Sequence, residues 1–309
     1  MKLKALLSAI LFAVFGLAAL AQQEPAFPGT QASIVVSAEA QHGTTVPALR
    51  AEDVIVTQGK QRDQVISLEP LFSSQAGVQA FILIDDSLST SDLGPKLNDI
   101  RQFIGAQPAN VQVGVAYMRN GTVLIAQNPT NDRAAAAKAL RLPTGESAGG
   151  ASPYFSVGEL IKRWPETNAA RQVVMISDGI DPYWDSFSLD DPYVNEAIDL
   201  AQRARVVVNA IYARGDGHLG HTLWRNTLGQ SFLSELADSS GGEAYYLATD
   251  SPPSFTPYLN QIAKRMQHAY LLTFKAQPGP KSGMQPVKIS TEVPNVDLVA
   301  QSRVYVPVS

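Results

Sequence analysis

A short apolar segment that ends in a cluster of oxygen-bearing side chains constrains the fold of this chain most strongly. Residues Phe81 to Ile84 read FILI and are followed by DDSLS at positions 85–89. A run rich in large and β-branched residues is typical of a strand buried on both faces of a sheet. Ligands of open α/β sheets bind where such strands end. The segment therefore predicts a central strand that carries a polar site at its carboxyl end.

Asp85, Ser87 and Ser89 alternate along this polar segment. One carboxylate and two hydroxyls form a hard, oxygen-only set of donors, which suits Mg²⁺, Mn²⁺ or Ca²⁺. Because hydroxyls are neutral, a bound ion would keep much of its charge and could accept a carboxylate from a partner. A plainer interpretation is that Asp85 ends the strand and that Ser87 or Ser89 caps the next helix. The segment by itself does not decide between the two.

Two later segments favour the metal site. Val173 to Gly179 (VVMISDG) is a second apolar run that ends in an acid and a glycine. Gly150 to Pro153 (GASP) places a hydroxyl just before a predicted helix, with proline suited to its first turn. With the Asp-x-Ser-x-Ser segment, these elements resemble a von Willebrand factor type A domain. The segment 46–54 also resembles the β segment that precedes this domain in a group of bacterial secreted proteins.

The resemblance implies a metal ion-dependent adhesion site, with Mg²⁺ as the first choice and Mn²⁺ or Ca²⁺ as alternatives. In that family the site combines Asp-x-Ser-x-Ser, a threonine from a Gly-x-Thr loop and the aspartate of an Asp-Gly strand end. Ser152 stands where the family usually has threonine; it keeps the hydroxyl and lacks the methyl group. The candidate ligands are Asp85, Ser87, Ser89, Ser152 and Asp178. Asp86 is expected to be solvated or to add to the negative field, without coordinating the ion.

Residues 75–268 alternate between strand-like and helix-like patterns, which predicts a doubly wound, mostly parallel α/β sheet. In the family fold, the strands that end at Asp85 and Asp178 are neighbours where the strand order reverses. Predicted strands cover 81–84, 111–118, 121–127, 173–178, 206–213 and 243–248. Predicted helices cover 93–104, 131–140, 153–163, 190–203, 231–239 and 255–267.

The flanking segments read differently. Residues 22–30 are polar and contain Pro25 and Pro28, which indicates a disordered leader. Residues 31–74 and 269–309 contain short β-type runs broken by glycine and proline. We expect the two segments to pair into one small β module in which the α/β domain is inserted. The alternative is a separate C-terminal tail that lies along the main domain.

The first 21 residues indicate export. Lys2 and Lys4 precede an apolar stretch that ends Ala19-Leu20-Ala21, the pattern of a cleavable signal peptide. A membrane anchor is the alternative, but the stretch is shorter than the ~20 residues that span a bilayer. The chain has no cysteine and a net charge of −4, so it offers neither disulfides nor a basic surface for nucleic acid. We expect a secreted or periplasmic protein.

These features predict an exported binding module that engages a protein partner through a divalent cation. The alternative is an accessory or scaffold subunit of an envelope enzyme or metal-handling complex, with the site structural or unoccupied. An enzyme is not expected, because Ser87 lacks a Gly-x-Ser-x-Gly turn and no glycine-rich phosphate loop occurs. The acidic and aromatic loop 179–191 would disfavour an acidic partner group and offer aromatic contact area, or else be a solvated surface loop.

Overall fold

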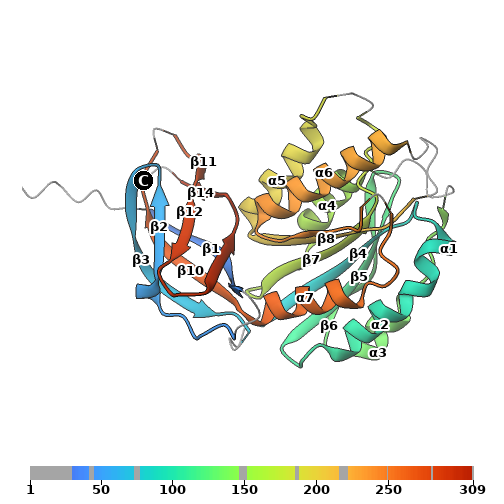
Figure 1. Cartoon of the computed structure of the whole chain (residues 1–309), viewed down its shortest axis with the longest axis horizontal. Helices are drawn as coiled ribbons and strands as arrows, with labels where there is room; N and C mark the ends of the chain where they lie inside the picture. Colours follow the sequence, from blue (N-terminus) through green and yellow to red (C-terminus); the bar gives the residue numbers. More distant parts are fainter. Residues whose placement is uncertain are drawn as a thin grey trace, which may run out of the picture.

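The computed structural model describes residues 30–41, 45–72, 77–145, 152–184, 188–215, 222–248, 250–279 and 281–307. The predicted signal peptide and the leader up to residue 29 lie outside these ranges, as do Gly150 and Ala151 of the predicted hydroxyl loop. Figure 1 shows an α/β domain beside a smaller β module. Within the described ranges, no helix combines the length and the apolarity that crossing a membrane requires.

The α/β domain is built on a sheet that, over the described residues, has six strands in the order β6-β5-β4-β7-β8-β9. β6 pairs antiparallel with β5, and the other pairings are parallel. The strands are β4 (Val78–Asp85), β5 (Val111–Arg119), β6 (Thr122–Thr130), β7 (Ala170–Ser177), β8 (Val206–Tyr212) and β9 (Ala244–Tyr245). The strand order reverses between β4 and β7, which confirms the predicted doubly wound, mostly parallel sheet.

Helices cover both faces of this sheet (Figure 1). They are α1 (Thr90–Leu93), α2 (Leu97–Ala106), α3 (Arg133–Lys138), α4 (Pro153–Arg163), α5 (Pro192–Ala204), α6 (Leu223–Ser240) and α7 (Thr256–Gln267), with a 3-10 turn at Gly94–Lys96. Side chains alternate along β4, so that Ile82 and Ile84 pack in the core beneath α2 and α7. Phe81 and Leu83 pack in the core beneath α4, α5 and α6. This two-sided burial explains the apolar run of β4.

Three elements of this domain differ from the sequence-based predictions. The helix expected at 93–104 is divided, since α1 ends at Leu93 and α2 begins at Leu97 after a 3-10 turn. α6 begins at Leu223, eight residues before the helix expected at 231–239. Its first turn exposes Leu223 and Trp224, so it lacks the regular apolar face that marks a helix in sequence. The strand expected at 243–248 is reduced to Ala244–Tyr245.

The carboxylate of Asp99 fixes the start of α7 by hydrogen bonds. Asp99 of α2 accepts hydrogen bonds on Oδ2 from the Ser254 hydroxyl at 2.7 Å and from the Phe255 and Thr256 amides at 2.8 and 3.3 Å. Burial raises the pKa of Asp99, but these hydrogen bonds outweigh it and leave the pKa below the ordinary value of 3.8. The carboxylate thus ties α2 to the first turn of α7.

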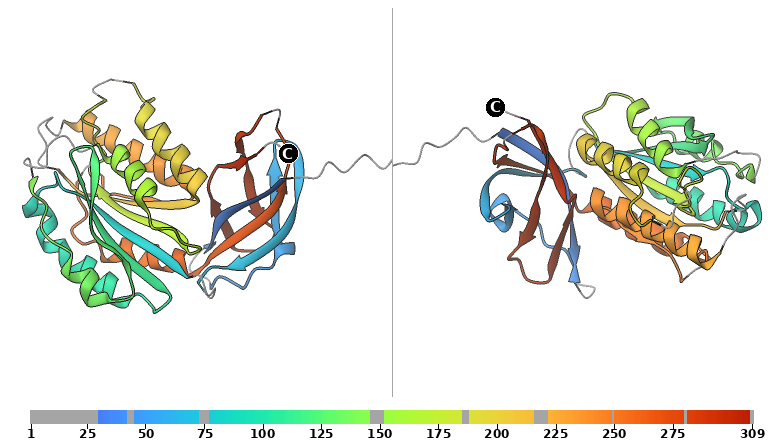
Figure 2. Two further views of the ribbon diagram at one scale, coloured as in Figure 1. Left: turned by 180° about the vertical axis from the view of Figure 1, so that it is seen from behind. Right: turned by 90° about the horizontal axis from the view of Figure 1, so that it is seen from above.

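The β module combines both flanking segments of the chain (Figure 2). Its larger sheet has the described order β12-β2-β3-β10-β1-β13, and β11 pairs with β14. The elements are β1 (Thr30–Ala40), a 3-10 turn (Ala51–Asp53), β2 (Val54–Gln58), β3 (Gln61–Pro70), β10 (Ala269–Ala276), β11 (Gly283–Pro286), β12 (Lys288–Thr291), β13 (Val296–Ala300) and β14 (Arg303–Val306). β1 pairs with β10 on one side and β13 on the other, so strands from the two chain ends interleave.

Candidate functional site

Asp85 is the last residue of β4 and is buried, with 1% of its surface exposed. Its Oδ1 accepts hydrogen bonds from the Ser87 amide at 2.9 Å and from the Ser87 hydroxyl at 2.6 Å. Burial raises the pKa of the Asp85 carboxyl, against the opposing effect of these hydrogen bonds. The turn after β4 therefore holds two of the predicted ligands in contact with each other.

Asp178 follows β7, which pairs with β4 in parallel, so the two acids lie at the same edge of the sheet. Asp178 is 5% exposed, and its Oδ1 accepts a hydrogen bond from the Ile180 amide at 2.9 Å. Burial, followed by the charge of Asp85, raises the pKa of Asp178 to about 8. Two carboxylates that lie more than 90 residues apart in sequence thus repel each other in one buried place.

Ser177 belongs to this cluster and was not predicted from sequence. Its hydroxyl donates to Asp85 Oδ2 at 2.8 Å and accepts a hydrogen bond from the Gly179 amide at 3.0 Å. The residue is fully buried between the two strand ends. The position of Ser177 just before Asp178 was the available signal that its hydroxyl belongs to the site. Its hydrogen-bond partner Asp85 is 92 positions away, so the sequence did not reveal the contact.

A pair of glycines lets α6 approach the Asp178 turn at backbone distance. Gly179 has a φ of +70°, and a Cβ atom there would lie 2.3 Å from the Gly229 carbonyl oxygen. A Cβ atom on Gly229 of α6 would lie 2.3 Å from the Asp178 carbonyl oxygen. Side chains at either position would push the helix and the turn apart.

Ser89 lies at the N-cap position of α1 but makes no side-chain capping hydrogen bond there. Its hydroxyl is 2.9 Å from the Ser91 hydroxyl, and its amide donates to the Arg214 carbonyl oxygen at 3.1 Å. The residue is 8% exposed. Ser89 therefore does not cap the helix through its side chain, as the alternative interpretation expected.

Ser152 makes contacts outside the Asp85 cluster. It caps α4 by accepting a hydrogen bond from the Phe155 amide at 3.3 Å. Its hydroxyl donates to Asp181 Oδ2 at 2.6 Å, and both residues are buried. Burial raises the pKa of Asp181 to about 6, although the hydrogen bonds from Ser152 and the Tyr183 amide oppose the shift. The hydroxyl of Ser152 is thus held by an acid of the loop after β7.

Of the two alternatives predicted for Asp86, solvation was wrong, since none of its side-chain surface is exposed. Its charge does add to the negative field of the site, because it contributes to raising the pKa of Asp85. Arg141 forms a two-pronged ion pair with Asp86, with N–O distances of 2.6 and 2.9 Å, and the Thr144 amide donates to it at 3.0 Å. Arg119 lies 3.8 Å away. The alternation of side chains along an extended strand end explains why Asp86 leaves the cluster that Asp85 enters.

The loop after β7 is partly inside the molecule. Asp181 is buried, and Asp191 caps α5 by accepting hydrogen bonds from the Tyr193 and Val194 amides at 2.8 and 3.4 Å. Tyr183 is 52% exposed. Residues 185–187, with Asp185 and Phe187, lie outside the described ranges. The loop is therefore not simply a solvated surface segment.

The residues present suit a hard cation. Asp85, Asp178 and nearby hydroxyls offer only oxygen donors, and the two buried carboxylates destabilise each other unless positive charge neutralises them. Over the described ranges, no group of three or more His, Cys, Asp or Glu side chains could hold a metal. A site here would thus depend on serine hydroxyls in addition to the two acids.

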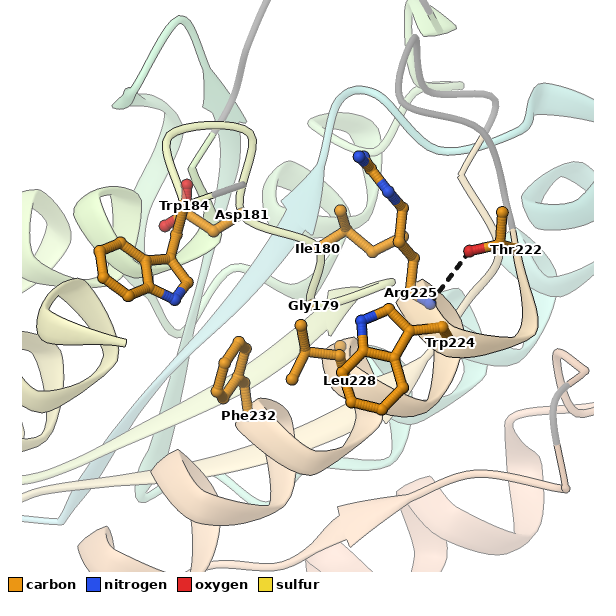
Figure 3. A pocket seen from close by; sticks show the side chains of 10 residues that line it. Gly179, Ile180, Asp181, Trp184, Thr222, Trp224, Arg225, Leu228 and Phe232 are labelled. Atoms are coloured by element: carbon orange, nitrogen blue, oxygen red, sulfur yellow. Dashed lines mark hydrogen bonds between the residues drawn. The ribbon is translucent and has the colours of Figure 1, made fainter. Parts of the chain in front are cut away.

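A pocket of about 400 Å³ opens beside the Asp178 turn, between α6 and the loop after β7. Figure 3 shows the aromatic side chains of Trp184, Trp224 and Phe232 around it. Its lining residues are Gly179, Ile180, Asp181, Trp184, Thr222, Trp224, Arg225, Leu228, Gly229 and Phe232. The sequence did not predict this pocket, since its walls come from segments about 40 residues apart.

No family model and no curated protein matches the chain. Some solved structures resemble this chain, and the three that follow have TM-scores below 0.5. BatB from Bacteroides thetaiotaomicron is 16% identical with a TM-score of 0.45, over 62% of this chain and 97% of that one. A von Willebrand factor type A protein from Catenulispora acidiphila is 12% identical with a TM-score of 0.43, over 93% of this chain and 76% of that one. An aerotolerance-related membrane protein from Bacteroides fragilis is 14% identical with a TM-score of 0.44, over 62% and 98%.

Proposed function

We propose that the α/β domain is a binding module that holds a divalent cation at the carboxyl edge of its sheet and engages a protein partner there. Asp85, Ser87, Ser89 and Asp178 would hold the cation, with Mg²⁺ foremost. The cation would supply a positive charge with open coordination positions for a carboxylate of the partner. The observation that carries the proposal is the burial of Asp85 and Asp178 side by side at the point where the strand order reverses.

The other residues of the site position these ligands. Ser177 orients Asp85 through the hydrogen bond to Oδ2, and the contact between Gly179 and Gly229 fixes the turn that carries Asp178. Ser152 can join the ligand set only if its hydroxyl leaves Asp181. Its role is therefore conditional on a change in that hydrogen bond.

The cation is tested by its effect on stability. A ligand that binds only the folded state adds about 2.7 kcal/mol to the free energy of unfolding at 100 times its Kd. We expect Mg²⁺ to raise that free energy relative to EDTA in the wild type, and not in Asp85→Ala or Asp178→Asn. All three tryptophans, Trp164, Trp184 and Trp224, lie in the α/β domain, so their fluorescence reports its unfolding.

Asp297→Asn is the matched control, because this acid is exposed on β13 of the β module. It should keep the full response to Mg²⁺. Equal stability of the wild type in EDTA and in Mg²⁺, Mn²⁺ or Ca²⁺ would contradict the proposed cation site. The partner is tested separately by capture from an envelope fraction, which should require the cation and be lost with EDTA and with Asp178→Asn.

The second candidate function is that of an accessory or scaffold subunit whose site is structural. It is favoured by one observation: both carboxylate oxygens of Asp85 already accept hydrogen bonds, from the hydroxyls of Ser87 and Ser177. This candidate predicts no response of stability to divalent cations. Export to the periplasm or the exterior is part of both proposals and rests on the N-terminal 21 residues. It is tested by sequencing the mature N-terminus, which should begin at Gln22.

A further inference from the structure

The pocket beside the Asp178 turn has the size and lining of a ligand site. Its volume of about 400 Å³ falls within the ~300–1,000 Å³ of small-molecule pockets. Figure 3 shows Trp184, Phe232 and Leu228 around the space, with Trp224 at its side. Apolar walls of this kind favour an aromatic or large aliphatic group.

One polar atom in the pocket wall needs a partner. The indole Nε1 of Trp184 is buried, and no described residue accepts a hydrogen bond from it. In Figure 3 this nitrogen faces the space that Phe232 and Leu228 border. A buried donor that stays unpaired costs about 1–3 kcal/mol. A ligand group that presents an oxygen to Trp184 would recover this free energy.

The charges around the pocket favour a neutral oxygen over a carboxylate. Asp181 lines the pocket and is 5% exposed, so its carboxylate would repel an anion. Arg225 also lines the pocket, but Figure 3 shows its side chain extending away from Phe232 and Leu228. A phenol combines an aromatic ring with an uncharged oxygen that accepts and donates hydrogen bonds.

The mouth of the pocket points to a polypeptide as the source of that group. Leu223 and Trp224 at the start of α6 are 68 and 45% exposed, and Trp224 lines the pocket. Exposed aromatic and aliphatic side chains next to a cavity are typical of protein interfaces. Gly179 belongs both to the pocket wall and to the turn of Asp178, so the pocket adjoins the turn that carries this candidate ligand.

We propose that this pocket receives a tyrosine side chain of the partner protein, whose phenol oxygen accepts the hydrogen bond of Trp184 Nε1. The proposal deepens the proposed function, on which it rests, by naming a second anchor beside the partner carboxylate at the cation. The tyrosine supplies apolar contact and the carboxylate supplies charge, so the partner is recognised by an acidic residue near a tyrosine.

The test is an NMR titration of the full chain with N-acetyl-L-tyrosinamide in EDTA, observing the three tryptophan indole N–H signals. We expect saturable shifts of the Trp184 and Trp224 signals with a Kd in the millimolar range, which corresponds to about 4 kcal/mol. Trp164 serves as the internal control, because its Nε1 already donates to Gln79 Oε1 at 2.8 Å. Its signal should not move.

Variants separate the hydrogen bond from the apolar contact. N-acetyl-L-phenylalaninamide should bind the wild type about tenfold more weakly than the tyrosine compound. In Trp184→Phe the two compounds should bind equally. Leu228→Trp should fill the pocket and abolish binding, whereas Leu124→Trp, at a residue 48% exposed on β6, should leave it unchanged.

Absence of a saturable shift in the wild type would overturn the proposal, as would equal binding of the tyrosine and phenylalanine compounds. Binding of free p-cresol without binding of N-acetyl-L-tyrosinamide would overturn the polypeptide as the source. Since EDTA is present throughout, these outcomes do not depend on the cation. Failure of the cation site appears instead as a missing effect of Mg²⁺ on unfolding, so the two failures are distinguishable.

Discussion

The ion pair between Asp86 and Arg141 anchors the turn that carries Asp85 and Ser87, and removing it should destabilise the α/β domain strongly. In Arg141→Met the guanidinium is lost while an apolar chain of similar length remains. The Asp86 side chain has no exposed surface, so its charge would stay buried without its main partner. Breaking a buried ion pair on one side costs about 3–5 kcal/mol.

The structure places the expected cost at the low end of that range, about 3 kcal/mol. Arg141 is 37% exposed, and Arg119 at 3.8 Å and the Thr144 amide at 3.0 Å would still face Asp86. The guanidinium of Arg141 also lies 3.8 Å from the ring centroid of Tyr117. Loss of that contact adds about 0.5–1 kcal/mol.

The assay is urea unfolding followed by tryptophan fluorescence, which reports the α/β domain. Adding Asp86→Asn to Arg141→Met removes the unpaired charge, so the double variant should be more stable than Arg141→Met alone. Lys162→Met is the control, because Lys162 is 53% exposed in its pair with Glu159 and such pairs contribute at most ~1 kcal/mol. A cost below about 1 kcal/mol for Arg141→Met, or no recovery in the double variant, would refute the reasoning.

Three further predictions follow from single contacts. Gly229→Ala should lower the urea midpoint and weaken Mg²⁺ binding together, because its Cβ would lie 2.3 Å from the Asp178 carbonyl oxygen; unchanged Mg²⁺ affinity would show that the turn tolerates the shift. Ser177→Ala should cost about 1–3 kcal/mol by removing the buried hydrogen bond to Asp85, and equal urea midpoints would contradict this. Asp99→Asn should lower the free energy of unfolding by about 1 kcal/mol at neutral pH. Because folding lowers the pKa of Asp99, its stabilising effect is present above pH 3.8 and is lost as the pH falls through the folded-state pKa. The difference in unfolding free energy between Asp99→Asn and the wild type should therefore shrink in acid. A difference that stays constant with pH would show that the Asp99 charge is not its cause.

Local sequence signals determined the central elements of the α/β domain. The apolar run of β4 is buried on both faces, and Ser152 with Pro153 begins α4 where predicted. Asn120 and Gly121, with φ of 51° and 66°, form the turn between β5 and β6. These elements were predictable because short-range geometry and burial on two faces act on neighbouring residues.

The start of α6 was not predictable in the same way. Its first turn presents Leu223 and Trp224 to solvent, so no apolar periodicity announces it. Thr222 caps the helix by accepting a hydrogen bond from the Arg225 amide at 3.3 Å. This capping residue was the available signal for the true start of the helix, whose first turn carries Trp224 of the pocket wall.

Sequence by itself fixed which oxygen-bearing residues stand at the ends of two buried strands. Tertiary structure alone decided their contacts: that Ser177 supports Asp85, that Asp181 holds Ser152, and that Arg141 draws Asp86 away. These pairs lie 92, 29 and 55 positions apart. The physical reason is that a hydrogen bond or ion pair across strands depends on register and packing, which no window of neighbouring residues specifies.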